Sequence, residues 1–207
     1  MRKSLAAIAA LLLCCTISMA QTGKKKATFG FKAGINLSTF RTAVDYSNYD
    51  PNIKLGGVIG GFVDIPISSK FAFQPEFLYS QLGSKAFDDF YGNKTLYYNY
   101  FSVPLLVKFK MFKNWNLLGG GEADFLIRAR EKDYLDHKTT ITNDIKDFDF
   151  AYTLGVETSL SKNIVVALRY IHGTQDVSTT SDENTLFNQA LQATFGWKLF
   201  KKAKKAK

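Results

Sequence analysis

WNLLGGGEADFLIRAR, residues 115–130, alternates apolar and polar side chains over most of its length. If this stretch is a β-strand, successive side chains point to opposite faces. One face then carries Trp115, Leu117, Ala123, Phe125, Ile127 and Ala129, and the other carries Asn116, Glu122, Asp124, Arg128 and Arg130. Charges on one face and apolar side chains on the other are typical of a barrel wall with lipid outside and a polar lumen inside. The stretch therefore predicts one wall strand of a transmembrane β-barrel.

The same period-two alternation occurs in other segments along the chain. The predicted strands span residues 28–38, 54–65, 71–82, 96–110, 115–130, 148–160, 164–173 and 186–200. Each supplies 10–16 residues, which is enough for a tilted strand to cross the hydrocarbon layer. An open sheet would expose unpaired backbone groups to lipid, so the strands should close on one another. The expected fold is all-β, an eight-stranded antiparallel up-and-down transmembrane β-barrel.

The connections between these strands alternate in length. Short ones at 66–70, 111–114 and 161–163 follow the second, fourth and sixth strands, and longer polar ones at 39–53, 84–95, 131–147 and 174–185 follow the others. In outer-membrane barrels the short turns face the periplasm and the long loops face outward. Because the strand number is even, both termini are expected in the periplasm. Pro75 donates no ladder hydrogen bond, so we also expect a β-bulge at that position.

The first residues form a separate segment. Arg2 and Lys3 precede an uncharged apolar run at 5–17, and Ser18-Met19-Ala20 ends it with small residues at its first and third positions. This order is that of a secretory signal peptide, and the run is shorter than the roughly 18 residues of a spanning helix. We expect a signal peptide at 1–20, a barrel domain at 21–200 and a lysine-rich tail at 201–207. A short membrane anchor is the alternative interpretation of the first segment.

Cysteine content and charge narrow the function classes. Cys14 and Cys15 are the only cysteines and lie in the predicted signal peptide, so we expect neither a disulfide nor a cysteine metal site. The net charge is +9, and the tail at 201–207 supplies five of the positive charges. No nucleic-acid-binding motif accompanies this basicity, and we expect no nucleic-acid partner. A solvated tail, or one that touches anionic lipid head groups, explains it.

The polar faces of the predicted strands place nine charged residues in the lumen. They are Lys32, Glu76, Lys108, Glu122, Asp124, Arg128, Arg130, Glu157 and Arg169. Because an isolated buried charge is very costly, these residues should pair with one another. An eight-stranded barrel is only wide enough for side chains to fill, so we expect the pairs to plug the lumen. The alternative is a selectivity lining or a small-ligand site. We expect no metal and no cofactor.

Two histidines are the remaining candidates for catalysis. An outer-membrane hydrolase or acyltransferase could use His172 as a base, Asp176 to orient it and Ser178 as a nucleophile, although the spacing matches no known motif. A metal site at His137 would need more ligands than the histidines offer, although Asp133 and Asp136 lie close to it. We therefore expect a protein that is not an enzyme.

Five segments also carry a family resemblance: FGFKAGINLS (29–38), FAFQPEFLYSQLGSK (71–85), YFSVPLLVKFK (100–110), GGGEADFLI (119–127) and YTLGVETSLSKNIVVALRYIHG (152–173). Together they resemble the PorT-like outer-membrane β-barrel family, which is common in Bacteroidetes. The resemblance covers nearly all of the chain after residue 20 and implies a porin-like outer-membrane barrel. Some members are linked to protein secretion, and the family has no uniform catalytic motif. The tail after Phe200 departs from a barrel that ends on its final aromatic residue.

The sequence thus predicts an integral outer-membrane protein with a structural, adhesive or envelope-complex role. A small passive porin, a membrane-embedded enzyme and a soluble barrel with an aromatic core are the alternatives. The expected partners are outer-membrane lipid and, through the long loops, other envelope proteins. Those loops carry Tyr46, Tyr49, Phe87, Phe90, Tyr91 and Tyr134, which mark either a binding surface or the upper rim of the barrel.

Overall fold

The computed structural model describes residues 27–42, 49–88, 92–133, 135, 137–142, 145–177 and 186–199, and these form a single sheet. Its strands are β1 (Thr28–Thr42), β2 (Tyr49–Asn52), β3 (Lys54–Pro66), β4 (Phe71–Leu82), β5 (Lys85–Asp88), β6 (Gly92–Lys110), β7 (Trp115–Lys132), β8 (Lys138–Thr140), β9 (Phe148–Ser159), β10 (Ile164–Gly173) and β11 (Leu186–Leu199). Within the described ranges, no helix has the length and apolar character to cross a membrane.

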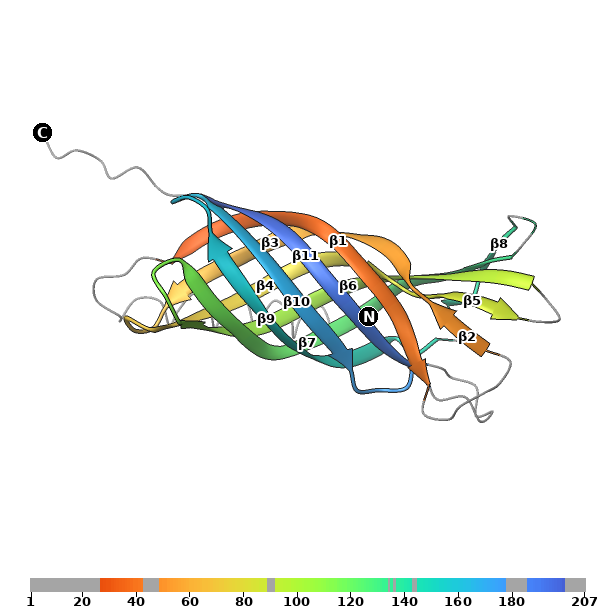
Figure 1. Cartoon of the computed structure of the whole chain (residues 1–207). Coiled ribbons are helices and arrows are strands. Elements are labelled where there is room, and N and C mark those ends of the chain that lie inside the picture. The colour runs from red at the N-terminus through yellow and green to blue at the C-terminus, as the bar shows by residue number, and fades with distance from the viewer. Residues whose placement is uncertain are drawn as a thin grey trace, which may run out of the picture.

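Eight of these strands close into a barrel (Figure 1). Their order around the wall is β6-β4-β3-β1-β11-β10-β9-β7, and β7 pairs with β6 to complete the circle. Every neighbouring pair in the wall is antiparallel. The first and last wall strands pair from Phe29↔Leu199 to Thr42↔Leu186. The predicted eight-stranded antiparallel barrel is confirmed, and each wall strand matches a predicted segment to within a few residues.

Three short strands extend the sheet beyond the barrel at the long-loop end. β5 continues alongside β6, β2 pairs with β5, and β8 pairs with β7. In Figure 1 these strands project to the right of the wall. They fall inside the predicted loops, because a segment of three or four residues is too short to show a period of two.

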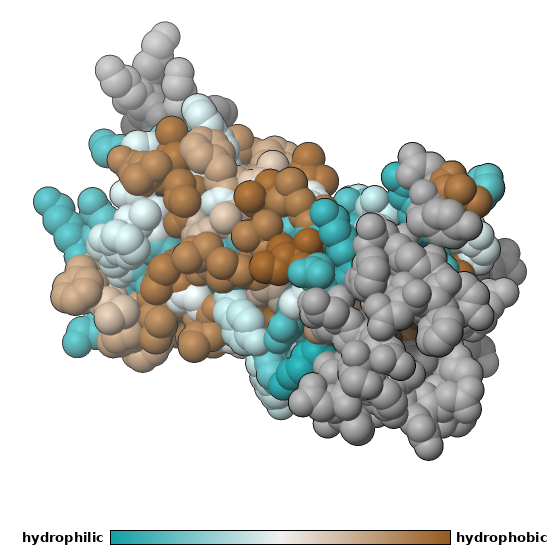
Figure 2. All heavy atoms as spheres, turned by 45° about the vertical axis from the view of Figure 1, so that its right-hand side comes forward, coloured by the Kyte–Doolittle hydropathy of each residue, from teal (hydrophilic) through white to brown (hydrophobic). Residues whose placement is uncertain are grey.

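The outer face of the wall is mainly apolar, and buried polar side chains lie on the inner face. On β3, Leu55 and Ile59 are 61% and 60% exposed, whereas Lys54 is only 2% exposed. Figure 2 shows one face of the wall, where apolar side chains gather over the strands. This arrangement reverses that of a water-soluble barrel and is the one that a hydrocarbon environment requires.

A β-bulge in β7 changes which side chains face inward. Asn99 of β6 pairs with Arg128, but the next residue, Tyr100, pairs with Leu126, so Ile127 is an extra residue without a partner on β6. An extra residue reverses the alternation beyond it. Consequently Ala129, which alternation alone places outside, is fully buried.

Pro75 causes no bulge, so the prediction of one at that position is wrong. The register between β4 and β6 is the same at Pro75↔Leu105 and at Leu78↔Ser102. The missing donor is accommodated by a local gap in the ladder instead. Pairing with β3 stops at Glu76 and resumes at Phe73 without a shift of register.

Candidate functional site

Glu76 is the centre of the polar interior. Arg169 donates to both of its carboxylate oxygens, from Nη1 to Oε2 at 2.8 Å and from Nη2 to Oε1 at 2.6 Å. Lys32 Nζ donates to Oε1 at 2.6 Å, and Gln74 Nε2 donates to the same oxygen at 2.5 Å. All four side chains are buried. Glu76 lies on β4 and Arg169 on β10, which are four strands apart in a wall of eight, so this bidentate pair crosses the lumen.

A second ion-pair cluster lies nearer the short turns. Lys108 Nζ lies 2.5 Å from Glu157 Oε1 and 3.1 Å from Asp64 Oδ2. Lys198 Nζ lies 2.8 Å from the same oxygen of Asp64. Gln74 joins the two clusters, because its Oε1 accepts from Lys108 at 2.8 Å while its Nε2 donates to Glu76. The ion pairs therefore form one connected network.

Three further buried carboxylates have neutral partners. Thr153 donates to Glu122 at 2.9 Å, Ser102 donates to Asp124, and Asn188 Nδ2 donates to Asp149 at 2.8 Å. In the described part of the chain, no salt bridge reaches these three carboxylates, and no group of residues could hold a metal ion. Hydroxyl and amide donors solvate them in place of cations.

An apolar cluster fills the barrel at the long-loop end. It comprises Phe40, Leu82, Tyr98, Tyr100, Ala129, Ile145, Ala151, Ile171, Val177 and Ala190. Most of these are inward positions near the ends of wall strands, but Ile145 and Val177 come from the connections. Lys146 N donates to Val177 O at 3.0 Å, which ties those connections together above the cluster. Sequence analysis missed this layer, although Tyr98 and Tyr100 stood on the inward face of their strand.

The structure brings seven of the nine predicted lumen residues into the interior. They are Lys32, Glu76, Lys108, Glu122, Asp124, Glu157 and Arg169, each at most 4% exposed. Arg128 is exposed and Arg130 is half-buried, and neither joins the network. The prediction for these two is wrong because the bulge at Ile127 reverses the alternation of β7 beyond it.

Four interior charges were not among the predicted nine. They are Lys54, Asp64, Asp149 and Lys198. Alternation placed Asp64, Asp149 and Lys198 on the polar faces of their strands, and that signal could have found them. Lys54 stands at the first residue of β3; its Nζ donates to Leu82 O at 3.2 Å and lies 4.5 Å from the centre of the Tyr97 ring.

Because of the bulge, only one of the two arginines, Arg128 and Arg169, is expected to contribute to the free energy of unfolding. Arg128→Gln is expected to change the free energy of unfolding by less than about 0.5 kcal/mol, as for most surface substitutions. Arg169→Gln removes the bidentate partner of Glu76 and is expected to cost about 3 kcal/mol or more. Urea unfolding in lipid vesicles measures both. Equal losses would show that Arg128 also lies in the interior network.

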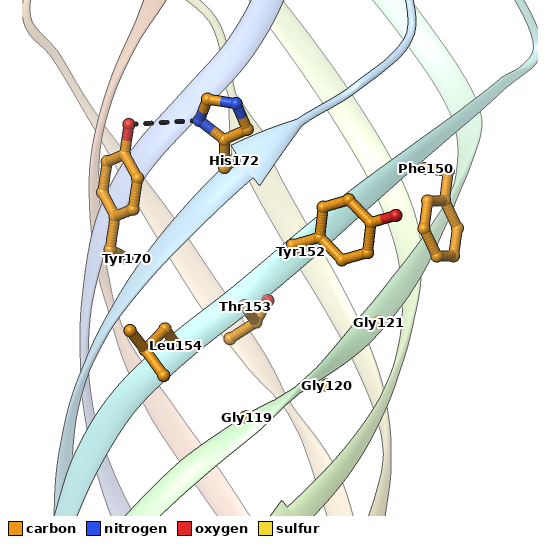
Figure 3. Close-up of a pocket in the computed structure, with 9 residues that line it drawn as sticks. All are labelled: Gly119, Gly120, Gly121, Phe150, Tyr152, Thr153, Leu154, Tyr170 and His172. Atoms are coloured by element: carbon orange, nitrogen blue, oxygen red, sulfur yellow. Dashed lines mark hydrogen bonds between the residues drawn. The ribbon is translucent and has the colours of Figure 1, made fainter.

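An apolar hollow lies on the outer face of the wall (Figure 3). It is floored by Gly119, Gly120 and Gly121 of β7 and flanked by aromatic side chains of β9 and β10, with a volume of about 570 Å³. A second hollow of about 520 Å³ lies over β1, β3 and β11. Both belong to the apolar outer face of the wall, so lipid chains are their natural occupants.

Among the described residues, His172 makes no hydrogen bond to Asp176, its predicted orienting group. His172 lies at the upper edge of the hollow in Figure 3, where its Nδ1 is 3.4 Å from the Tyr170 hydroxyl and its Nε2 is 3.1 Å from Arg41 Nη1. Asp176 instead accepts from Leu186 N at 2.9 Å and pairs with Lys146 at 3.7 Å. The described residues therefore contain no hydrogen bond between the proposed base and its orienting group. Ser178 lies outside the described residues.

Several predicted features lie outside what the structure describes. They include the signal peptide at 1–20 and the lysine-rich tail at 201–207. The side chains of the loop aromatics, Tyr46, Tyr49, Phe87, Phe90, Tyr91 and Tyr134, also lie outside it, as does Asp136. His137 is described, and its Nδ1 lies 3.5 Å from Asp133 Oδ2 in an exposed pair.

Comparison with known proteins agrees with this architecture. Neisserial surface protein A (NspA) is similar over 84% of this chain and 100% of its own, with a TM-score of 0.55 and 11% identity. The attachment invasion locus protein Ail of Yersinia pestis, solved with the heparin analogue sucrose octasulfate, is similar over 84% of this chain and 100% of its own, with a TM-score of 0.50 and 12% identity. At such low identity these likenesses show the fold alone.

A search of curated proteins found no match to the chain. Residues 19–179, well over half of the chain, match the family described as outer membrane protein beta-barrel domain. The match covers most of the wall, from β1 to β10. The chain therefore belongs to the outer membrane protein beta-barrel domain family.

Proposed function

We propose that this protein is a non-conducting outer-membrane barrel with a structural, adhesive or envelope-complex role. The observation that carries the proposal is the pair between Arg169 and Glu76, because it joins opposite walls across the lumen. A buried bidentate pair holds its geometry, since breaking it leaves two uncompensated charges in the interior.

The filling of the interior supports the same proposal. The ion-pair network occupies the middle of the barrel and the part toward the short turns, and the apolar cluster occupies the part near the long loops. An eight-stranded barrel has room for little more than its own side chains. Ions that entered would have to displace both layers.

Planar-bilayer recording tests this proposal. The refolded protein, checked for its folded form by heat-modifiable migration on a gel, is expected to show no stable conductance steps at any ionic strength. The E76A/R169A variant removes the ion pair across the lumen but keeps the apolar cluster, so it should conduct only if the ion pair is the main barrier. Reproducible steps from the unmodified protein would overturn the proposal.

A small passive porin is the second candidate, because some buried polar atoms lack partners. Within the described residues, Asp149 Oδ1, Arg169 Nε and Gln192 Oε1 accept or donate no hydrogen bond. Atoms of this kind are commonly solvated by buried water. If water formed a continuous path through the lumen past these atoms, the bilayer recording would show small conductance steps. That result would distinguish the porin from the non-conducting barrel.

We also propose that residues 1–20 are a cleaved signal peptide and that both termini of the mature chain lie in the periplasm. Support comes from the charged, apolar and small residue order of this segment. The PorT-like assignment and envelope-protein partners at the long-loop end are part of the same proposal. Intact mass of the protein from native membranes should correspond to a chain that begins at Gln21, and a retained leader would refute the cleavage.

A further inference from the structure

Lysines surround the opening of the barrel at its short-turn end. A hollow of about 270 Å³ lies there, and Lys70, Lys108, Lys110, Lys113 and Lys198 contribute to its lining. Asp64 is the one acidic residue among the described residues that line it. The ion-pair network bounds the hollow on the inner side, because Lys108, Lys198 and Asp64 belong to that network and also line the hollow.

The hollow has an excess of positive charge. Lys108 and Lys198 are compensated, because they pair with Asp64 and Glu157 at 2.5–3.1 Å. Within the described ranges, no salt bridge reaches Lys70, Lys110 or Lys113. Three ammonium groups therefore remain without a counter-charge around one small hollow.

The backbone around the hollow is held in place by hydrogen bonds. Lys110 N donates to Lys70 O at 2.8 Å, so the end of β6 is fixed to the turn before β4. Within that turn, Ser68 Oγ accepts from Lys70 N at 3.2 Å and from Phe71 N at 3.0 Å. Ser159 N donates to Asn114 O at 2.9 Å and fixes a second turn. Lys110 thus stands at the end of β6, and Lys70 and Lys113 stand in two turns whose backbone is held by hydrogen bonds, which reduces the backbone entropy lost on ligand binding.

We propose that this hollow binds a multivalent oxyanion that carries phosphate groups. A phosphate monoester has a charge near −1.5 to −2 at neutral pH and three acceptor oxygens, whereas a carboxylate carries a single charge. Lysine binds phosphate through a compact ammonium charge on a flexible side chain, so several lysines can surround one phosphate group. Three uncompensated ammoniums, with the serine and asparagine side chains that line the same hollow, match that chemistry. The phosphate belongs either to a lipid head group at this rim or to a soluble oligophosphate.

Isothermal titration with tripolyphosphate tests the site in refolded full-length protein. The expected result is saturable binding to the unmodified protein, and binding about tenfold weaker to the triple variant K70Q/K110Q/K113Q, because each exposed ion pair contributes roughly two- to threefold. The triple variant K85Q/K138Q/K146Q removes the same charge at the long-loop end and should bind within about twofold of the unmodified protein. The substituted lysines of the first variant are exposed, so folding should be preserved, and heat-modifiable migration checks this.

Two lipid compositions distinguish the sources of phosphate. In vesicles that contain phosphatidylglycerol, a lipid-derived ligand would compete with tripolyphosphate and weaken its apparent binding relative to phosphatidylcholine vesicles. That difference should vanish in K70Q/K110Q/K113Q. Equal tripolyphosphate binding in both kinds of vesicle indicates a soluble ligand. Binding that is absent, or that falls equally in the two triple variants, would overturn the proposal.

Discussion

Glu76→Gln is expected to lower the free energy of unfolding by about 3–5 kcal/mol, the range found when one partner of a buried ion pair is removed. The carboxylate accepts from Arg169, Lys32 and Gln74 and is itself fully buried. The neutral amide keeps the shape of the side chain but leaves two cations in the interior without a counter-charge. Urea unfolding in lipid vesicles, followed by tryptophan fluorescence, measures the change.

Glu131→Gln is the matched control for this substitution. Glu131 pairs with Lys94 at 3.2 Å, but both side chains are about 30% exposed. Exposed pairs of this kind contribute about 0–1 kcal/mol. If Glu76→Gln were no more destabilising than Glu131→Gln, the pair across the lumen would not hold the barrel together.

Ile59→Arg is expected to lower the stability of the inserted barrel by about 2–4 kcal/mol, the cost of a cation on the lipid face near the bilayer midplane. Ile59 is 60% exposed and stands in the middle of β3. The physical cause is desolvation of the guanidinium by hydrocarbon, and the residues paired with Ile59 on the adjacent strands, Ala33 and Tyr79, offer it no counter-charge. The same unfolding assay measures it.

Leu135→Arg distinguishes exposure to lipid from exposure to water. Leu135 is 57% exposed, close to the value for Ile59, but it lies in a connection at the long-loop end. Arginine there should change stability by less than about 0.5 kcal/mol. Equal costs at the two positions would contradict immersion of the wall in lipid.

The wall of the barrel could be predicted from the sequence because each strand is long enough to show its period. Lipid on one side and a filled lumen on the other impose opposite requirements on successive residues, so β4 and β10 were predicted with their observed bounds. The short strands β2, β5 and β8 were not predicted, since pairing with a neighbour defines them and their own residues carry no pattern.

The interior site was predictable only where the alternation is unbroken. Lys32, Glu76 and Arg169 follow from their position on the polar face of a strand. Arg128 does not, because one additional residue in β7 changes the direction of its side chain, and nothing local to that residue reveals the bulge. Alternation also predicts which face of the strand a side chain occupies, but it does not predict which residue that side chain pairs with. That Arg169 pairs with Glu76 across the lumen depends on strand order and register, which only the closed barrel determines.

The pairing of β1 with β11 makes the two ends of the polypeptide interdependent during synthesis and insertion. These strands share fourteen residue pairs, and the second of them is the last wall strand to leave the ribosome. A chain that stops before residue 186 would contain every other wall strand, but the edges of β1 and β10 would remain unpaired in hydrocarbon. Each unpaired backbone group there costs several kcal/mol. Loss of β11 should therefore abolish stable insertion completely and not weaken it gradually. The barrel can then insert stably only after its last wall strand has been synthesised.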